Sequence, residues 1–324
     1  MHQTTRIVPI FAIAVLVLAV SPFFGASNML SLAEVCEKGT VGHGIFWNLR
    51  VPRVLTAFLT GGALSLGGCC FQTLFRNDLA TPYTLGVSGG ASLGAAIAVR
   101  LGVAMTLWGQ STLSVFAFLG ALFSAFLVFG ISRFNGRRTT GHTLLAGVAV
   151  SFLFSSLIMF MQYLGREAEL FRILRWMFGN LAITGYRELA IMVPFCLVAA
   201  SILFLHLREL DILSISDDFA ASHGVNVHRC FLIIFLAVSM LVGTVVAFCG
   251  PIGFVGMVCP HICRRLVGVS HRVLVPASLL FGGAFLVLCD CLGRVIIAPS
   301  EMPVGIITAL LGAPFFLWLL SQKQ

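Results

Sequence analysis

One pattern in this chain has the residue types of a metal site, namely the C-P-H-I-C run at 259–263. Zinc is held by about four nitrogen, sulfur or oxygen ligands in a tetrahedron. On a helix Cys259 and Cys263 would share one face, but His261 between them would point away, and the proline indicates a kink or helix boundary. The run therefore predicts no metal site, and no catalytic set of acid, base and nucleophile is evident elsewhere.

Charged residues that could drive catalysis or transport are few. The only lysines are Lys38 and Lys323, and neither lies in the G-x-x-x-x-G-K-[S/T] run that binds nucleotide phosphates. Any energised work must therefore use a nucleotide site on another subunit. Asp290 and Arg294 are four residues apart in an apolar segment, a spacing at which they can pair on one helix face. We expect a structural role for Asp290, with Arg294 near the helix end free to act elsewhere.

The composition indicates that these residues lie in a membrane protein. Of the 324 residues, 59% are hydrophobic and 10% are charged, whereas soluble domains carry about 25% charged residues. A net charge of +8 would favour nucleic acid in a soluble chain, but here the basic residues fall at the ends of apolar segments, which suits lipid headgroups. Most of the ten cysteines lie in apolar runs, where cysteine acts as a small hydrophobe.

Ten apolar segments are each long enough, or nearly so, to cross a membrane core about 30 Å thick as a helix. We predict them at 7–26, 53–75, 85–104, 113–132, 142–164, 189–207, 231–249, 252–268, 274–297 and 303–321. The first resembles a signal peptide without a clean cleavage site, so we expect it to remain as a transmembrane helix. The prediction is an all-α polytopic membrane protein with a single transmembrane domain over 1–324. Arginine clusters at 133–138 and 264–272 favour cytoplasmic termini.

Glycine follows a pattern that predicts close helix packing. Gly86, Gly90 and Gly94 recur at four-residue spacing, and Gly61 belongs to a second stripe of small residues. Small residues on one face let helix backbones approach closely within a membrane. We expect packing to be their main role, with lining of a pathway as the alternative.

The loop at 208–230 contains the signals of a short helix. Ser216 followed by Asp217 and Asp218 is typical of a helix start, and Gly224 is a plausible stop. Such a helix suits a contact with a partner protein, although a solvated loop fits this stretch equally well.

Two further segments allow a structural and a functional interpretation. Arg50 and Arg53 flank the first turn of a predicted helix, where they could anchor to headgroups or bind an acidic partner surface. The chain is broken between the last two segments by a proline- and glycine-containing stretch at 299–305. Such a break is either a plain turn or backbone that lines a cavity.

Several strings taken together resemble the permease subunits of the FecCD family, the membrane halves of ABC importers for iron–siderophore complexes, haem and vitamin B12. The first is R-V-P-R-V-L-T-A-F-L-T-G-G-A at 50–63, which continues to 91. The others are W-M-F-G-N-L at 176–181, the run at 210–227, G-P-I-G-F-V-G-M-V-C-P-H-I-C-R at 250–264, H-R-V-L-V-P-A-S at 271–278 and E-M-P-V-G-I-I-T-A-L-L-G-A-P-F-F-L-W-L-L at 301–320. The chain departs from the family at Asn77-Asp78, where Asn-Pro is usual, and at Thr81, which replaces a frequent acidic residue.

The resemblance implies a ten-helix permease of the type II importer kind in the bacterial inner membrane. Its implied partners are a second permease copy or a paralogue, two cytoplasmic ATPases that hold ATP and magnesium, a periplasmic binding protein and membrane lipid. No cofactor is implied on this chain itself. The implied docking residues for the binding protein are Arg50, Arg53 and Arg294. The implied ATPase-coupling residues are Ser216, Asp217, Asp218, Ala220, Gly224 and Val225, and candidates for the pathway or gate are Glu301, Met302, Pro303 and Gly305.

Two other classes of function stay open at this point. A self-sufficient secondary transporter needs ionisable residues inside the bundle, and Asp290 is the only carboxylate expected at membrane depth. A membrane-embedded metalloenzyme would have to be built around the C-P-H-I-C run. The motifs do not distinguish a siderophore, haem or cobalamin, although an iron chelate or haem is the first expectation.

Overall fold

The computed structural model describes residues 6–25, 32–102, 106–107, 110–134, 140–297 and 299–321. Part of the predicted arginine cluster at 133–138 lies outside these ranges. The described residues are almost entirely helical, which confirms the predicted all-α class, and their one strand pair is β1 (Thr106–Leu107) with β2 (Gln110–Ser111). In chain order the helices are α1 (Ile7–Val20), η2 (Ser21–Phe23), α2 (Leu32–Cys36), α3 (Val41–Ile45), η3 (Phe46–Arg50), α4 (Val51–Phe75), α5 (Val87–Arg100), α6 (Thr112–Phe134), α7 (Thr140–Leu164), α8 (Glu167–Met177), α9 (Arg187–Leu205), α10 (Leu207–Leu213), α11 (Asp217–Ser222), α12 (Val227–Cys249), α13 (Val255–Val267), α14 (His271–Val295) and α15 (Val304–Ser321).

Six helical stretches of the described chain are long and apolar enough to cross a membrane: Val41–Phe75, Thr112–Ser132, Gly141–Leu164, Arg187–Leu205, Val227–Cys249 and His271–Val295. Two shorter apolar helices, Ile7–Phe23 and Val304–Leu319, join them. These eight helical stretches fall in eight of the ten predicted segments. The other two predicted segments contain α5 and α13, which have only 14 and 13 residues. The chain is therefore a multi-pass membrane protein in which some helices are shorter than a full crossing.

The short helices differ from the predicted segments 85–104 and 252–268. An irregular segment precedes each of them, 76–86 before α5 and 250–254 before α13. The segment at 250–254 is as apolar as a helix, so hydropathy alone does not reveal the break before α13, whereas Arg76, Asn77 and Asp78 mark the break before α5. Irregular backbone is tolerated at membrane depth only where protein buries it or where it lines a cavity. Both segments line one cavity, described below.

The second predicted segment also begins earlier than expected. Helical backbone runs without a break from Val41 to Phe75, and η3 within it is a π-helical turn. Pro52 is the second residue after this turn. Proline has no N–H group to donate to the preceding turn, and a π turn is one way for a helix to accommodate that loss.

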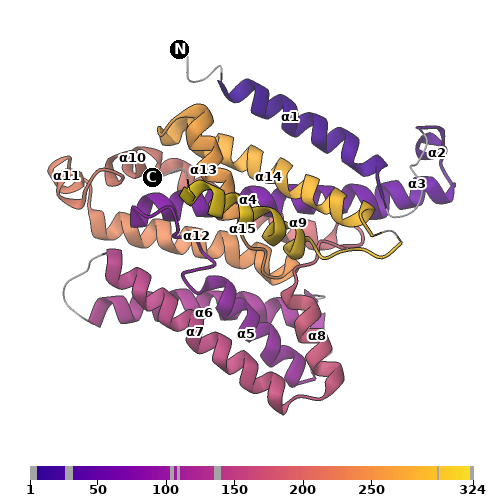
Figure 1. The fold of residues 1–324 in the computed structure, drawn as a ribbon, viewed down its shortest axis with the longest axis horizontal. Helices are drawn as coiled ribbons and strands as arrows, with labels where there is room; N and C mark the ends of the chain where they lie inside the picture. Colours follow the sequence, from indigo (N-terminus) through magenta and orange to yellow (C-terminus); the bar gives the residue numbers. More distant parts are fainter. Residues whose placement is uncertain are drawn as a thin grey trace.

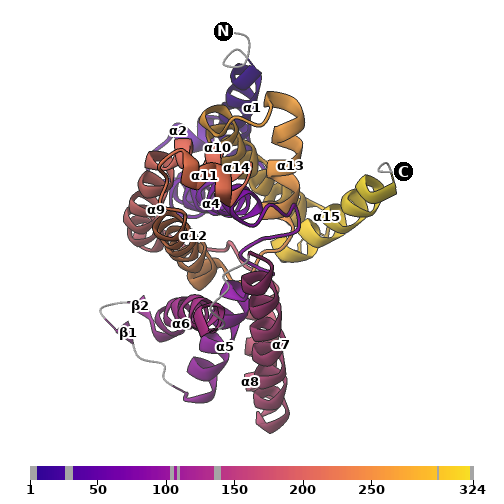
Figure 2. The same cartoon turned by 90° about the vertical axis from the view of Figure 1, so that its left-hand side faces the viewer.

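The centre of the fold is α4, most of whose side chains are buried. Figure 1 shows α14 lying along α4, with α1 on the far side of α14, while α5, α6, α7 and α8 form a separate group below. Viewed at right angles, α15 extends outward from the central bundle and α7 with α8 extends in another direction (Figure 2). The molecule thus consists of a core around α4 with two projecting helical groups.

Glycines allow the closest helix contacts. A Cβ atom on Gly61 would overlap the Gly282 carbonyl oxygen of α14, and one on Gly90 would overlap the Gly120 carbonyl oxygen of α6. Gly94 meets the backbone of α6 in the same way. Gly86 has a φ of +86° and forms the N-cap of α5, a conformation that favours glycine. At these glycines the helices therefore pack backbone against backbone.

Candidate functional site

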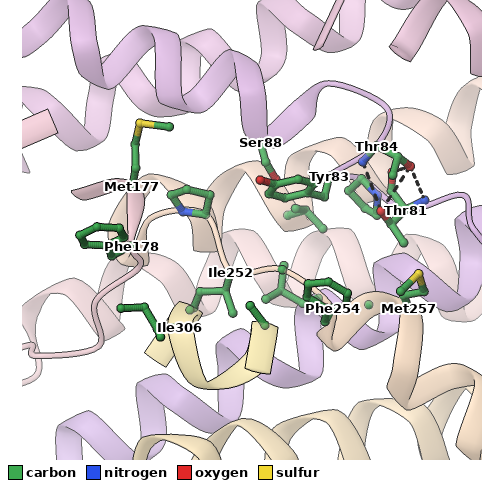
Figure 3. Close-up of a pocket in the computed structure, with 18 of the residues that line it drawn as sticks. Thr81, Tyr83, Thr84, Ser88, Met177, Phe178, Ile252, Phe254, Met257 and Ile306 are labelled. Carbon is green, nitrogen blue, oxygen red and sulfur yellow. Dashed lines mark hydrogen bonds between the residues drawn. The ribbon is translucent and has the colours of Figure 1, made fainter. Parts of the chain in front are cut away.

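A cavity of about 570 Å³ lies where α5 and α13 begin, beside the first turns of α15. Figure 3 shows Tyr83, Phe178, Ile252 and Phe254 around it, together with Ile306 of α15. Most of this wall is apolar, and the irregular segments 81–84 and 251–254 form part of it. A cavity of this size and character can accept a bulky, largely apolar ligand or form part of a passage.

Polar groups at one end of the cavity are held by a tight turn. The Thr81 N–H donates to Thr84 Oγ1 at 2.9 Å, and the Thr84 N–H donates to Thr81 Oγ1 at 3.2 Å (Figure 3). Upstream, the Leu79 N–H donates to Asn77 Oδ1 at 2.9 Å, which forms an Asx turn. Asp78 pairs with Arg264 of α13 at 3.1 Å. The departure from Asn-Pro thus yields a turn fixed by hydrogen bonds and one ion pair.

The cavity wall also contains a strained residue. Phe254 has a φ of +67°, a value rare for residues other than glycine. It lies directly before α13, and a Cβ atom on Gly312 of α15 would overlap its side chain. Gly305 is equally tight, because a Cβ atom there would overlap the Phe178 carbonyl oxygen. The junction of α8, α13 and α15 is therefore closely fitted at the cavity wall.

A second site lies at the α3 end of α4. Arg50, Arg53, Arg294 and Glu301 together line a cavity of about 330 Å³. The Arg53 guanidinium donates to Glu301 Oε2 at 2.7 Å. Arg50 Nη1 donates to the carbonyl of Phe23 at 2.8 Å. The three arginines expected to act together are thus gathered in one place, although internal groups already bind each of them.

The expectation that Arg294 is free was wrong. Its side chain is only 3% exposed, and Nη1 donates to the Phe24 carbonyl oxygen at 2.8 Å. Its Nε lies 3.1 Å from Asp290 Oδ2. Asp290 also accepts two bonds on Oδ1 from Arg53, from Nη2 at 2.8 Å and from Nε at 3.0 Å. One buried carboxylate therefore bridges α4 and α14, because the close packing of these helices brings Arg53 against it.

The candidates at 301–305 divide between the two cavities. Glu301 belongs to the arginine cluster, whereas Gly305 lines the larger cavity. The Met302 N–H donates to the Gly293 carbonyl at 3.0 Å, which ties the start of α15 to α14. Pro303 directly precedes Val304, the first residue of α15.

A third site lies at the opposite end of α4. The predicted short helix is α11, where the Ser216 side chain accepts from the Phe219 N–H at 3.0 Å. Gly224 has a φ of +79°, and the Val225 N–H donates to the Ala220 carbonyl at 3.0 Å. The acidic first turn and the left-handed glycine thus form the two ends of the helix, as these residue types favour.

Two connections tie α11 and α10 to the end of α4. Arg76 forms an ion pair with Asp217 and donates through Nε to the Leu213 carbonyl at 2.9 Å. Asp218 follows Asp217 in the same exposed first turn. Because Arg76 is itself the C-cap of α4, this contact joins the coupling segment directly to the central helix.

The other connection passes through a buried histidine. His271 Nδ1 lies 2.6 Å from Asp211 Oδ1 of α10, and Nε2 lies 2.7 Å from Thr73 Oγ1 of α4. The backbone N–H of His271 also donates to the Asp211 carboxylate at 2.8 Å. Since a carboxylate only accepts, Nδ1 must carry a proton. This chain of contacts joins α10, α14 and α4, and no local pattern indicates it because its members are far apart in the sequence.

Within the described residues, no three His, Cys, Asp or Glu side chains are grouped so that they could hold a metal ion. Cys259 and Cys263 are fully buried in the helical core. The residues missed from the sequence are the aromatic cavity-lining side chains Tyr83, Phe178 and Phe254. The only available signal was their position beside glycines and prolines in apolar runs.

Known proteins resemble this chain over nearly its whole length. The family model of the FecCD transport family matches residues 11–322. The chain is 37% identical to the cobalamin import system permease protein BtuC of Halobacterium salinarum, over 86% of this chain and 74% of that protein. It is 35% identical to the hemin transport system permease protein HmuU of Yersinia pestis, over 95% of this chain and 94% of that protein. A solved structure described as an inward-facing conformation of a metal-chelate type ABC transporter is 31% identical, with a TM-score of 0.86 over 98% of this chain and 99% of that one.

Proposed function

The chain belongs to the FecCD transport family, and from that premise we propose that it is the membrane permease of a binding-protein-dependent ABC importer. The proposed substrate is a metal chelate, with an iron–siderophore complex or haem preferred over cobalamin. The observation that supports this most directly is the 570 Å³ cavity lined by irregular backbone at the starts of α5 and α13. Broken helices around a cavity are typical of the substrate path in transporters.

The cavity supports a path formed by two permeases. It is bounded by α15, whose side chains Leu310, Leu317 and Trp318 are exposed. On α7, Phe152 and Tyr163 are also exposed. Such apolar faces must meet lipid or another subunit. A second copy or a paralogue covering the face beside the cavity would enclose a passage large enough for a chelate, which one chain leaves open on that side.

We assign binding-protein docking to the cavity lined by Arg50, Arg53 and Arg294. Guanidinium groups bind carboxylates in a bidentate manner, so acidic side chains are the expected partners. Glu301 already holds Arg53 and is 40% exposed, so an incoming carboxylate can take its place. Docking would then release the start of α15, where Glu301, Met302 and Pro303 lie, beside the larger cavity.

We assign ATPase coupling to α11 and its flanks. Ile215 and Phe219 are exposed apolar side chains on this short helix and its entry, and the acidic turn at Asp217 lies beside them. An apolar knob with charged neighbours suits insertion into a groove of a partner. ATP and magnesium would be held by that partner, because this chain has no phosphate-binding loop. The same assignment makes the α11 side cytoplasmic and the arginine side periplasmic.

Secondary transport receives less support. The one carboxylate expected to relay protons, Asp290, is bound by both Arg53 and Arg294. Internal ion pairs therefore occupy both of its oxygens, which favours a structural role over a proton relay.

The experiment is reconstitution of the chain in proteoliposomes with its co-expressed ATPase and binding protein. Uptake of labelled iron–siderophore, haem and cobalamin is measured with ATP inside the vesicles. We expect ATP-dependent uptake of one of these classes, and none when the P-loop lysine of the ATPase is replaced. Uptake driven by an ion gradient without the ATPase, or ATP hydrolysis by the isolated chain, would contradict the proposal.

A further inference from the structure

A cavity of about 530 Å³ lies where α9 ends, between the start of α10 and the start of α12, and Gly224 and Val225 of the coupling segment form one side of it. Its lining includes Arg208, Glu209 and Arg229, with Ile212 and Ile233 on its apolar side. We propose that this cavity binds a phospholipid headgroup that carries both a phosphate and a primary ammonium group, as phosphatidylethanolamine does. The inference does not depend on the transported substrate.

The position of the cavity fits a headgroup. It lies at the ends of two helices that are apolar and long enough to cross a membrane, Arg187–Leu205 and Val227–Cys249. In the first of these helices, α9, only 22% of the most apolar 18-residue stretch is buried, and Leu205 in its last turn is 78% exposed. Acyl chains can therefore lie along α9 while the headgroup enters the cavity at the boundary between membrane and water.

Two arginines are available for the phosphate. In the part of the chain that the structure describes, no hydrogen bond or ion pair is formed by the guanidinium of Arg208 or of Arg229. Planar guanidinium groups bind phosphate oxygens with two parallel hydrogen bonds. Arg229 lies in the first turn of α12, and the partial positive charge of that helix start adds to the attraction.

The ammonium group is inferred from Glu209. Its Oε2 atom is buried and receives no hydrogen bond from the described residues, although Glu209 lines the same cavity as both arginines. A buried carboxylate oxygen without a donor is costly, so a ligand that supplies N–H donors would be stabilised there. A phosphate alone would be repelled by this carboxylate. A headgroup with a positive end for Glu209 and a negative end for the arginines satisfies all three side chains.

The choice of lipids makes the test specific. Native mass spectrometry of the purified full chain in detergent is used to titrate phosphatidylethanolamine, phosphatidylcholine and phosphatidylglycerol. Phosphatidylcholine has the same net charge as phosphatidylethanolamine but no N–H donor, and phosphatidylglycerol has the phosphate without the ammonium. We expect phosphatidylethanolamine to bind about tenfold more tightly than phosphatidylcholine, as a charge-assisted hydrogen bond to Glu209 implies.

Variants separate the two ends of the headgroup. Arg208→Gln with Arg229→Gln should weaken all three lipids about tenfold or more, since both phosphate contacts are removed. Glu209→Gln should abolish the preference for phosphatidylethanolamine while phosphatidylglycerol binds as well or better. The matched control is Arg265→Gln with Arg272→Gln, which removes two exposed arginines outside the cavity and should leave binding unchanged.

Three results would overturn the inference. Equal losses in the cavity pair and the control pair would mean that the lipid responds only to overall charge. An unchanged preference of Glu209→Gln for phosphatidylethanolamine would show that Glu209 does not bind the ammonium group. Competition by millimolar inorganic phosphate would identify a general anion site, and loss of lipid on addition of the ATPase would identify the cavity as part of the subunit contact instead.

Discussion

Asp290→Asn offers the sharpest test of how α4 and α14 are held together. The substitution keeps the shape of the side chain and removes its charge. Two guanidiniums, those of Arg53 and Arg294, then remain in the cluster without the carboxylate that joins them. Since Asp290 is 2% exposed and Arg294 3%, water cannot readily replace the lost partner.

The expected cost follows from this burial. Removing one member of a buried ion pair destabilises a protein by about 3–5 kcal/mol, because a charge is left without compensation. Glu301→Gln is the matched control, since it removes a carboxylate from the same Arg53 but at a site that is 40% exposed. An exposed pair contributes only about 0–1 kcal/mol, so the two variants should differ by several kcal/mol.

The assay is equilibrium unfolding in mixed micelles with increasing SDS, followed by tryptophan fluorescence. A double-mutant cycle with Arg53→Gln adds a second criterion. Because Arg53 and Asp290 are in direct contact, the double variant should be more stable than the sum of the single effects predicts, by about 1 kcal/mol or more. Equal stabilities of Asp290→Asn and Glu301→Gln, or strict additivity in the cycle, would refute the assigned role of the buried carboxylate.

Three further predictions concern packing and the proposed partners. Gly68→Ala should destabilise the chain by about 1–3 kcal/mol, because the new Cβ atom would overlap the Gly256 backbone. The control is Gly130→Ala on α6, whose Cβ atom would meet open space and which should be neutral or stabilising in the same unfolding assay. Gly224→Pro should uncouple ATP hydrolysis from uptake with normal membrane insertion, since proline cannot adopt the φ of +79° there; unchanged transport would contradict this. Arg53→Glu should slow association with the binding protein about tenfold at low salt, with little difference at high salt. Equal association rates of the variant and the wild type at low salt would show that Arg53 does not take part in docking.

The sequence predicted the place and order of ten apolar helices because lipid demands continuous apolar segments, although only six of the described helical stretches are long enough to cross a membrane. It also predicted the ends of α11, since Ser216 and Gly224 satisfy local backbone requirements. It placed the start of α5 within two residues but put the start of α13 three residues too early. The segment before α13, G-P-I-G-F at 250–254, is apolar, and only its place against other helices explains why it is not helical.

The ion pairs show the same limit. Asp290 and Arg294 were predicted to pair because they are four residues apart on one helix. The stronger contact, from Arg53, joins residues 237 positions apart in the sequence. It depends on the register of α4 against α14, which Gly61 and Gly282 fix by letting the backbones touch. A local pattern can predict that Arg294 pairs with Asp290, whereas the contact with Arg53 follows only from helix packing.

The packing of α4 explains why its two ends matter together. This helix has 25 residues and is therefore about 37 Å long. At one end Arg53 holds Asp290 of α14, and at the other Thr73 and Arg76 hold the segments that lead into α11. Because Gly61 and Gly282 bring the two backbones into contact, α4 and α14 pack too closely for either helix to bend or slide without the other. We therefore expect a displacement of α11 to move both helices as one body and to reach the arginine cluster at the opposite end.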